Sequence, residues 1–252
     1  MLARLTTVPD TEEDIYSARF VSGLFDRMSR SYEVMNFVMS FGFSERWRRE
    51  LVGLIARPHA ATTVVDLMSG MGETWPSVRR AFPNAALHAL DFSPEMIEHA
   101  RTKNNDRFDG AFTLVADDVL AGGLPAEHFD VVVSAYGLKT FDAAQSHGLA
   151  AEVFRILRPG GQFAFIEVTQ PSTAVLRWLY DFYLSRIVPI VGRMLASDST
   201  EYSMLWRYLR AYGDGARSAA AFDDHPNLVV TRREHFFGCA TSFSGYRVAD
   251  IS

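Results

Sequence analysis

The sequence contains a single cysteine, Cys239, among its 252 residues. A chain with one cysteine forms no intrachain disulfide, so it depends on an ordinary hydrophobic core, and this usage suits a reducing compartment. Excess positive charge is also missing, because the formal net charge is −5. Nucleic-acid-binding proteins normally present a basic face, so we expect no nucleic-acid partner. The basic cluster at residues 46–49 fits a solvated helix face better than a nucleic-acid site.

The sequence has no long uncharged apolar run. Its most apolar stretch, residues 175–195, is interrupted by three arginines and one aspartate, and charges at this density exclude a simple membrane span. Residues 1–14 carry four acidic side chains and no apolar core of signal-peptide length. We therefore expect a cytoplasmic protein without a transmembrane segment.

The pattern of apolar residues divides the chain into regions. Helical spacing from residue 12 to 56 predicts two or three helices, broken near residues 29–31 and at Gly42. From residue 62 to 169, short β-rich runs alternate with helical segments, which predicts a parallel sheet with right-handed crossovers. The strand candidates there are residues 63–67, 86–90, 112–115, 129–134 and 162–168, and the helix candidates are residues 75–81, 144–157 and a helix that begins at Pro94 with Ser93 as its N-cap.

Helical periodicity returns between residues 171 and 212, and residues 228–248 alternate as a closing hairpin joined near Gly238. The sequence thus predicts an α/β fold, a Rossmann-like doubly wound sheet of seven strands, mostly parallel with one antiparallel strand. We expect one domain over residues 1–252. A helical N-terminal segment (1–57) and a helical insert (171–213) would cap the active site of a cofactor-binding core (58–170), and residues 214–252 would supply the closing strands.

The sharpest local feature is the segment 65–73, Val-Asp-Leu-Met-Ser-Gly-Met-Gly-Glu. A strand that ends in Asp66 is followed by a loop with glycine at alternate positions, Gly70 and Gly72. Glycine lets the backbone approach a ligand without Cβ obstruction, and the next helix directs its N-terminal amides toward that ligand. A tight strand-to-helix turn would also explain Gly-x-Gly alone. Asp91, about 20 residues further on at the end of the next strand, favours a nucleoside-containing cofactor, because a carboxylate there binds ribose hydroxyls.

The loop departs from a dinucleotide fingerprint. Glu73 and Thr74 stand where a third glycine would fall, and no Lys-Ser/Thr pair follows to grip a phosphate. This favours an adenosyl ligand without a pyrophosphate. Asp117 and Asp118 end the third strand, where they would either reach an adenine amino group or form a solvated turn.

Short segments along nearly the whole chain match a known pattern. They are residues 25–29 (Phe-Asp-Arg-Met-Ser), 32–36 (Tyr-Glu-Val-Met-Asn), 39–42 (Met-Ser-Phe-Gly), the loop 65–73, Asp91 with 93–96 (Ser-Pro-Glu-Met), 129–132, 136–138 (Tyr-Gly-Leu), 157–161, 198–202 (Asp-Ser-Thr-Glu-Tyr) and 245–247. In these segments the chain resembles the ubiquinone/menaquinone C-methyltransferase family. The cofactor elements are shared by many methyltransferases, whereas Tyr-x-x-Met-Asn and Met-Ser-Phe-Gly are far more specific.

The resemblance implies methyl transfer from S-adenosylmethionine to a ring carbon of a prenylated quinol. Loss of a phenolic proton enriches the ortho or para carbon, which attacks the sulfonium methyl in line, so the enzyme supplies mainly positioning and a dry, polarised site. The implied cofactor-binding residues are Tyr32, Asp66, Gly70, Gly72, Asp91, Phe92, Asp117, Asp118 and Ser134. Asp91 would hold the ribose, Asp117 the adenine, and Tyr32 would lie near the cofactor's open side. The catalytic candidates are Lys139, Tyr136 and Asp198, and the histidines show no metal-ligand spacing.

The chain departs from the family in two places. In the loop, Met68, Met71 and Glu73 replace a small residue, a threonine and an aspartate, and a long Met68 side chain would narrow the amino-acid end of the cofactor pocket. Lys139 replaces an arginine that is a candidate for assisting quinol deprotonation, and lysine retains the charge but loses the planar fork. Either the base chemistry is altered or the substrate is not the usual quinol. His147 is another base candidate, although a surface helix histidine explains it more simply.

The aromatic residues Trp178, Tyr180, Phe182 and Tyr183 either line a pocket for a prenyl or other apolar group, or pack in an ordinary core. A membrane-derived substrate would require only peripheral membrane contact through the apolar cap. Other functions remain as alternatives. They are methylation of a secondary metabolite at carbon, oxygen or nitrogen, non-methylating chemistry with S-adenosylmethionine, and a non-catalytic role as a binding subunit.

Overall fold

The architecture is a seven-stranded sheet with the strand order β3-β2-β1-β4-β5-β7-β6. The computed structural model describes residues 15–29, 36–37, 40, 42–56, 60–187, 190 and 200–249. The strands are β1 (Thr63–Leu67), β2 (Ala86–Asp91), β3 (Phe112–Ala116), β4 (Phe129–Ala135), β5 (Leu157–Val168), β6 (Leu228–His235) and β7 (Ala240–Arg247). β7 pairs antiparallel with both β5 and β6, and the other neighbours pair parallel. The predicted sheet, with β7 as its one antiparallel strand, is therefore confirmed.

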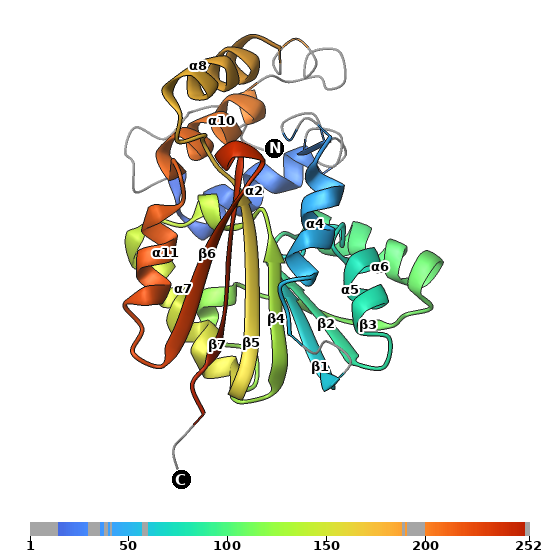
Figure 1. Ribbon diagram of the computed structural model, residues 1–252. Helices are drawn as coiled ribbons and strands as arrows, with labels where there is room; N and C mark the ends of the chain where they lie inside the picture. The colour runs from blue at the N-terminus through green and yellow to red at the C-terminus, as the bar shows by residue number, and fades with distance from the viewer. Residues whose placement is uncertain are drawn as a thin grey trace.

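Helices cover both faces of this sheet (Figure 1). They are α2 (Ala18–Met28), α4 (Ser44–Val52), α5 (Trp75–Ala81), α6 (Pro94–Phe108), α7 (Ala143–Ile156), α8 (Ala174–Phe182), α10 (Thr200–Tyr212) and α11 (Ala216–Asp223), with short turns η2 (Val119–Ala121), η3 (Leu138–Thr140), η4 (Tyr183–Ile187) and η5 (Phe236–Gly238). α4, α5 and α6 lie on one face and α7 with α11 on the other. Helix α11 precedes the closing hairpin and was not predicted, because its short apolar pattern lies between stronger signals.

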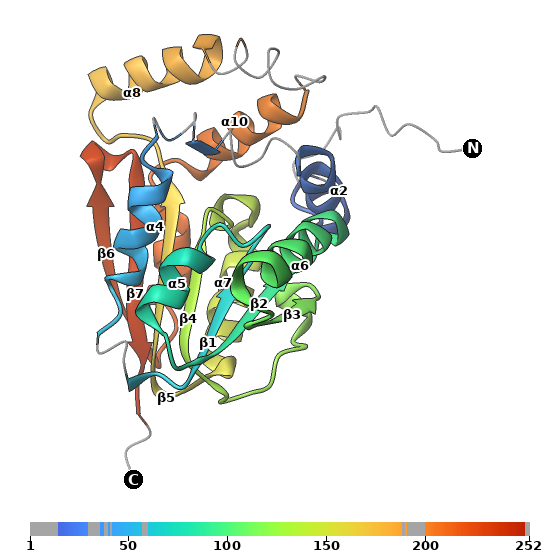
Figure 2. The ribbon, with the colours of Figure 1, turned by 90° about the vertical axis from the view of Figure 1, so that its right-hand side faces the viewer.

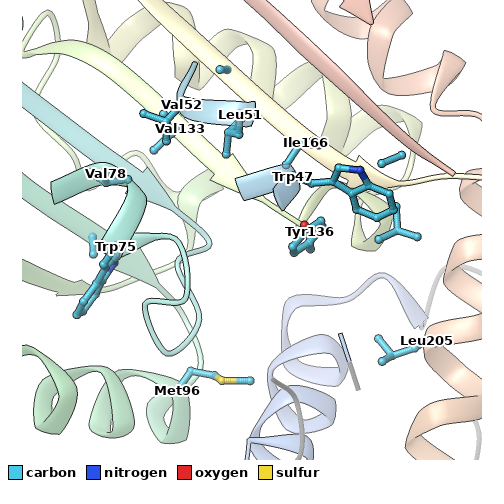
Figure 3. Close-up of a cluster of buried hydrophobic side chains, with 14 of the residues drawn as sticks. Trp47, Leu51, Val52, Trp75, Val78, Met96, Val133, Tyr136, Ile166 and Leu205 are labelled. Carbon is cyan, nitrogen blue, oxygen red and sulfur yellow. The ribbon is translucent and has the colours of Figure 1, made fainter. Parts of the chain in front are cut away.

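The two faces are separated by strict alternation along the strands. Val64 and Val133 point to the α4 side, whereas Val65 and Val132 point to the α7 side, as the period of two in a strand requires. On the first face, Trp47 and Leu51 of α4 pack in one buried cluster with the strand residues Val133 and Ile166 (Figure 3). On the second, Phe222 of α11 contacts the rings of Phe163 and Phe165, each at 5.3 Å between centroids.

Local signals place the helix starts as predicted. Ser93 caps α6 by accepting a hydrogen bond from the Met96 N–H at 3.2 Å, with Pro94 as the first helical residue. α7 ends at Ile156, but β5 begins at Leu157, five residues before the predicted start at Gln162. The strand bulges between these residues, where Gly160 has φ +78°, and its register with β4 then resumes at Gln162.

β1 lies inside the sheet between β2 and β4, so the chain winds outward from β1 to β3 and then returns to β4. Open α/β sheets bind ligands beyond the carboxyl ends of the strands at such a reversal. α8 and α10 cross above this end of the sheet, and α2 lies beside it (Figure 2). Tyr208 of α10 is fully buried and its hydroxyl donates to the carbonyl of Ile15, which ties the C-terminal part of the cap to the N-terminal part.

Gly245 of β7 gives a test of the closing hairpin. A Cβ at this position would lie 1.8 Å from the carbonyl oxygen of Val229, so Gly245→Ala should force β6 and β7 apart. We expect a loss of about 2 kcal/mol or more, seen as a fall in Tm of roughly 4–8 °C. Gly148→Ala is the matched control, because Gly148 is exposed in α7, its added Cβ would meet only Leu120 at 3.5 Å, and alanine favours a helix. An equal effect of the two substitutions would contradict this packing.

Candidate active site

The loop after β1 adopts a backbone that its glycines permit. Gly70 and Gly72 have φ of +56° and +76°, in the left-handed region that L side chains rarely adopt. A Cβ on Gly72 would lie 2.4 Å from the ring of Trp75, so no other residue fits there. Met68 also has a positive φ, +52°, and its side chain closes on the next segment, since a Cβ on Gly137 would lie 2.6 Å from the Met68 sulfur.

Asp91 holds this loop against the end of β2. Its Oδ2 accepts a hydrogen bond from the Gly70 N–H at 2.8 Å and its Oδ1 accepts one from the Ser93 N–H at 2.9 Å. Burial raises the pKa of the Asp91 carboxyl, and these backbone donors oppose the rise. Ser93 in turn donates from its hydroxyl to Asp26 of α2, at 2.5 Å. One chain of hydrogen bonds therefore joins the loop, α6 and α2.

A cavity of about 690 Å³, open to solvent, lies between these elements. Its lining residues are Tyr16, Ala18, Val21, Phe25, Met68, Gly70, Leu90, Asp91, Phe92, Met96, Asp117, Asp118, Val119, Leu120, Tyr136, Gly137, Thr140, Phe141 and Gln145. Carboxylates gather at one side and apolar side chains form the rest of the wall, which is typical of a small-molecule site. Several predicted residues thus meet in one place: Gly70, Asp91, Phe92, Asp117, Asp118 and Tyr136.

Asp117 and Asp118 lie at the end of β3 on this cavity. Asp118 accepts a hydrogen bond from the Leu120 N–H at 2.9 Å and so caps the turn η2. Asp117 accepts one from the Asp118 N–H at 2.9 Å, and its other oxygen lies so close to Gly123 that a Cβ there would be 2.1 Å away. The pair therefore forms an ordered acidic corner rather than a loosely solvated turn.

A second, smaller pocket of about 230 Å³ adjoins the first and shares Met68, Gly70 and Tyr136 with it. Its other lining residues are Asn36, Arg48, Ser69, Glu73, Thr74 and Ala135. The pocket therefore combines a guanidinium with a carboxylate. This charge pattern complements a ligand group that carries both an anion and a cation, such as the amino-acid end of a cofactor.

Asp66 lies buried beside the second pocket, at the end of β1. Neither of its carboxylate oxygens has a hydrogen-bond partner of good geometry among the described residues. Burial raises the pKa of Asp66 well above the usual range, and the negative charges of Glu73 and Asp91 raise it further, while Arg48 and a hydrogen bond from the Trp75 side chain oppose them. A buried carboxylate whose charge is compensated only in part is unfavourable for folding, so it marks a place where a cation would be stabilised.

Tyr136 separates the two pockets and has a positive φ, +68°. Its hydroxyl donates to the carbonyl oxygen of Ser44 at 2.8 Å, and the guanidinium of Arg48 lies over its ring at 5.2 Å from the centroid. Ser134 lies in β4, two residues before Tyr136. It is buried, and its hydroxyl has no hydrogen-bond partner among the described residues.

Lys139 is turned away from the cavity wall. Its side chain is buried, with Nζ 3.0 Å from Glu167 Oε1 and donating also to the Tyr136 carbonyl. Glu167, at the end of β5, is fully buried and accepts further hydrogen bonds from the N–H groups of Lys139 and Val168, at 3.1 and 2.8 Å. Lys139 therefore fixes η3 and the backbone of Tyr136, and it does not line either pocket.

The other candidates lie elsewhere. Tyr32 and Asp198 fall outside the described residues. Gly72 lies in the loop and packs on Trp75, without lining either pocket. His147 is on the surface, where its ring contacts the Ala143 carbonyl and Asp224, and these contacts raise its pKa. Among the described residues no three His, Cys, Asp or Glu side chains are grouped closely enough to hold a metal ion.

Sequence reasoning missed several residues of the cavity wall, of which Thr140 and Gln145 are the polar members. Thr140 donates to the Gly137 carbonyl at 2.7 Å, and Gln145 donates to the Tyr16 carbonyl at 3.0 Å. Gln145 also completes a capping box with Asp142 at the start of α7. The spacing Asp-x-x-Gln before an apolar run is a recognised signal for such a box and would have located this helix start.

Comparisons with known proteins agree with this geometry. The model of the ubiE/COQ5 methyltransferase family matches residues 12–247. A demethylmenaquinone methyltransferase of Chlamydia trachomatis serovar D is 29% identical over 231 residues, covering 90% of this chain and 96% of its own. The ubiquinone/menaquinone biosynthesis C-methyltransferase UbiE of Desulfotalea psychrophila is 34% identical over 187 residues, 73% of each chain.

Solved structures show the same fold at low identity. A putative S-adenosyl-L-methionine-dependent methyltransferase of Methanococcus maripaludis superposes with a TM-score of 0.60 at 15% identity, covering 98% of both chains. The N-methyltransferase NodS of Bradyrhizobium japonicum, in complex with S-adenosyl-L-homocysteine, gives 0.55 at 15% identity and covers 81% of this chain and 87% of its own.

The fold and the site together define a Rossmann-like, S-adenosylmethionine-dependent methyltransferase. Within that class, the chain belongs to the ubiE/COQ5 methyltransferase family. The predicted family, enzyme class and cofactor are therefore confirmed. The cavity also fits the cofactor on its own chemistry, since it pairs an acidic side with apolar walls and a mixed-charge pocket. None of the helices in the described part of the chain has the length and apolar composition needed to cross a bilayer.

Asp66 supplies a test with opposite effects on stability and binding. Its raised pKa means that the folded state holds the proton to a higher pH than the unfolded chain, so the stability penalty grows as pH rises above the ordinary aspartate value of 3.8. Asp66→Asn should therefore raise the free energy of unfolding near neutral pH by about 1 kcal/mol or more, seen as a higher Tm, with the gain vanishing in acid. The same change should weaken S-adenosylmethionine binding by about tenfold, measured by calorimetry.

The control for this test is Asp106→Asn, an identical change on the exposed surface of α6. It should alter neither the Tm nor the affinity. A lower Tm for Asp66→Asn, or an affinity equal to that of the unsubstituted protein, would contradict the role of Asp66 as a partly compensated carboxylate that receives a cation.

Proposed function

We propose that this protein transfers the methyl group of S-adenosylmethionine to a ring carbon of a prenylated quinol. The observation that carries the proposal is one cavity with an acidic side and a large apolar wall, in a chain of the ubiE/COQ5 family. The names of its relatives, a demethylmenaquinone methyltransferase and a ubiquinone/menaquinone biosynthesis C-methyltransferase, support a quinol as the acceptor. A cytoplasmic location is part of the proposal and is supported by the single, buried and unpaired thiol of Cys239.

Different parts of the site would hold different parts of the cofactor. Asp91 keeps a free lone pair on each oxygen for the ribose hydroxyls, and Asp117 faces the adenine end of the cavity beside apolar Val119. The mixed-charge pocket would receive the amino-acid end, with Arg48 toward its carboxylate and Asp66 with Glu73 toward its ammonium. Gly70 allows the backbone between these groups to approach the ligand closely.

The bound cofactor supplies an activated methyl group on a sulfonium ion. The chain's own contribution is to exclude water and to orient the acceptor ring against that methyl. Val21 and Phe25 of α2 and Phe141 after η3 make an apolar wall that keeps the cavity dry, and desolvation strengthens the electrostatic interactions inside. Thr140 and Gln145 offer polar groups on the same wall, where they would orient a quinol hydroxyl.

We propose that Lys139 acts as a positioning residue. Its ammonium group is matched by Glu167, and it holds the Tyr136 carbonyl at the point where the backbone of Tyr136 takes a left-handed conformation. The ammonium group of Lys139 makes both contacts in the interior of the protein. An arginine would present a planar guanidinium group with several donors in its place. The positive charge of Lys139 would then stabilise η3. Because Tyr136 lines both pockets, the position of its backbone would affect the shape of both.

A divergent small-molecule methyltransferase is the second function that a specific observation favours. Met68 closes on Gly137 and lines both pockets, where the family has a small residue, so the space around the amino-acid end of the cofactor is narrower and the position of the methyl group toward the acceptor would change. An acceptor smaller or less planar than a quinol would then be methylated on this scaffold, because fold and cofactor site do not fix the acceptor.

Transfer of a labelled methyl group tests the function directly. The purified protein, given labelled S-adenosylmethionine and a panel of demethylated quinols and phenols, should label prenylated quinols at a ring carbon, as mass spectrometry would locate. Asp91→Ala should lower transfer to every acceptor by about tenfold or more, whereas Asp106→Ala should not. Cofactor turnover without a methylated product would contradict methyl transfer, and labelling of phenols alone would support the second function.

Paired substitutions separate positioning from base catalysis at Lys139. Lys139→Met leaves Glu167 buried and uncompensated, so we expect a loss of about 3–5 kcal/mol in stability together with low activity. The double variant Lys139→Met with Glu167→Met removes both charges and should regain most of the stability. If Lys139 positions Tyr136 through its ammonium group, Lys139→Arg should retain activity with an unchanged pH profile of kcat, whereas the double variant should be stable but less active, because methionine cannot donate to the Tyr136 carbonyl. A shifted pH profile of kcat in Lys139→Arg would contradict a positioning role and indicate proton transfer at this residue.

A further inference from the structure

We propose that α8 and the turn η5 form a docking surface for a bilayer that contains anionic lipids. The surface, here called the cap face, consists of Val175, Trp178, Leu179, Phe182 and Phe237. It lies at the end of the molecule above the carboxyl ends of the parallel strands (Figures 1 and 2).

α8 turns its apolar side outward. Val175, Trp178, Leu179 and Phe182 recur at the spacing of one helix face and are 69%, 67%, 49% and 52% exposed. The opposite side of the helix is the one that packs, since Tyr180 is 3% exposed and lies near Cys239 at the start of β7. The rings of Trp178 and Phe182 are stacked at 6.2 Å in solvent. A contiguous apolar patch of this kind on a soluble domain marks an interaction surface.

The turn η5 adds a third exposed aromatic residue, Phe237, to the cap face, and its backbone conformation is unfavourable. Phe236 and Phe237 both have positive φ, +43° and +56°, which is strained for residues with a side chain. The strain leaves Phe237 72% exposed. Gly238 next to it approaches the beginning of the cap, because a Cβ there would lie 3.4 Å from Pro171 Cα. Phe237 is therefore presented beside the base of the segment that leads into α8.

The net positive charge of the cap, residues 171–213, favours an anionic partner. Residues 171–213 contain five arginines against three acidic residues, whereas the whole chain has a net charge of −5. Arg186 is exposed and follows Phe182 by one helical turn on the same side. An amphipathic helix with Trp, Leu and Phe on one face and flanking arginines is the composition that lies in the interface of an anionic bilayer. The charge of the remaining chain opposes non-specific adsorption elsewhere.

The cap face and the cavity share one end of the fold. α10 contacts η3 and α2, which both border the cavity, and α8 lies above α10 (Figure 2). In this last step the inference rests on the proposed function, because a prenylated quinol dissolves in a bilayer and would enter from that side. None of the cap-face residues lines the cavity, so docking and methyl transfer are separable.

Sedimentation with vesicles tests the surface on the full chain. Vesicles of phosphatidylcholine mixed with phosphatidylglycerol should bind the protein, and vesicles of phosphatidylcholine alone should bind it several-fold more weakly, a difference that salt removes. Trp178→Ala with Phe182→Ala should lower the partition coefficient by about tenfold or more. The matched control is Val229→Ala with Tyr246→Ala, which removes two other exposed apolar side chains, from the β6–β7 edge, and should leave binding unchanged.

Two further readouts identify the residues in contact. Trp178 is far more exposed than the buried Trp47 and Trp75, so vesicles with brominated acyl chains should quench its emission, and Trp178→Phe should remove that quenching while vesicles still bind. Arg186→Glu should weaken binding to the mixed vesicles, whereas Arg80→Glu on α5 should do so by much less.

The outcomes are distinct. Absence of vesicle binding, or binding unaffected by the cap-face variant, would overturn the proposal. Self-association that depends on Trp178 and Phe182 without vesicle binding would assign the surface to a second copy of the chain instead. Vesicle binding needs no methyl acceptor, and the cap-face variant should methylate a detergent-dispersed acceptor at the normal rate. Failure of docking is therefore separable from failure of the proposed function.

Discussion

The carboxylate of Asp91 is the interaction on which the site depends. It stands at the end of β2 and accepts hydrogen bonds from Gly70 in the β1 loop and from Ser93 at the start of α6. Ser93 then reaches Asp26 of α2, so three elements that are distant in sequence are held around one cavity. The parallel sheet makes this possible because the ends of β1 and β2 lie side by side, with Asp91 two residues beyond Ala89, the partner of Asp66. A group that accepts two backbone donors and still faces the cavity is both structural and available to a ligand.

Two buried acidic residues, Glu167 and Asp66, lie at the same end of the sheet and differ in how their charges are compensated. Glu167 receives the Lys139 ammonium and two backbone N–H groups, so its charge is compensated within the fold. The charge of Asp66 is opposed only by Arg48 and the Trp75 side chain, and its pKa is raised well above the usual range. Both are unexposed, so burial alone does not distinguish them. The difference lies in compensation, which is complete for the acid on β5 and incomplete for the acid on β1.

The sequence was sufficient for the sheet and for much of the cavity, because those features are local. Strand alternation, the glycines at 70 and 72 and the Ser93-Pro94 start each depend on neighbours within a few residues. The environment of Lys139 is different. It is set by Glu167, 28 residues away, and only the pairing of β4 with β5 brings these side chains together. The family resemblance implied that the arginine usual at this position assists deprotonation of the substrate. In this chain the lysine is paired with Glu167 inside the fold.

For the aromatic residues of the helical insert, too, the sequence pattern alone does not determine which side chains are buried. From the sequence, Trp178, Tyr180 and Phe182 form one stripe that fits either a pocket or a core. The structure divides them, since Tyr180 is buried and the other two are in solvent, because α8 packs on the rest of the fold through one side only. A helix held by so few contacts could have buried its larger apolar face and did not. Exposing that face to water is unfavourable, so the helix would be stabilised by an apolar surface that covers it, and the bilayer proposed as its partner would supply one.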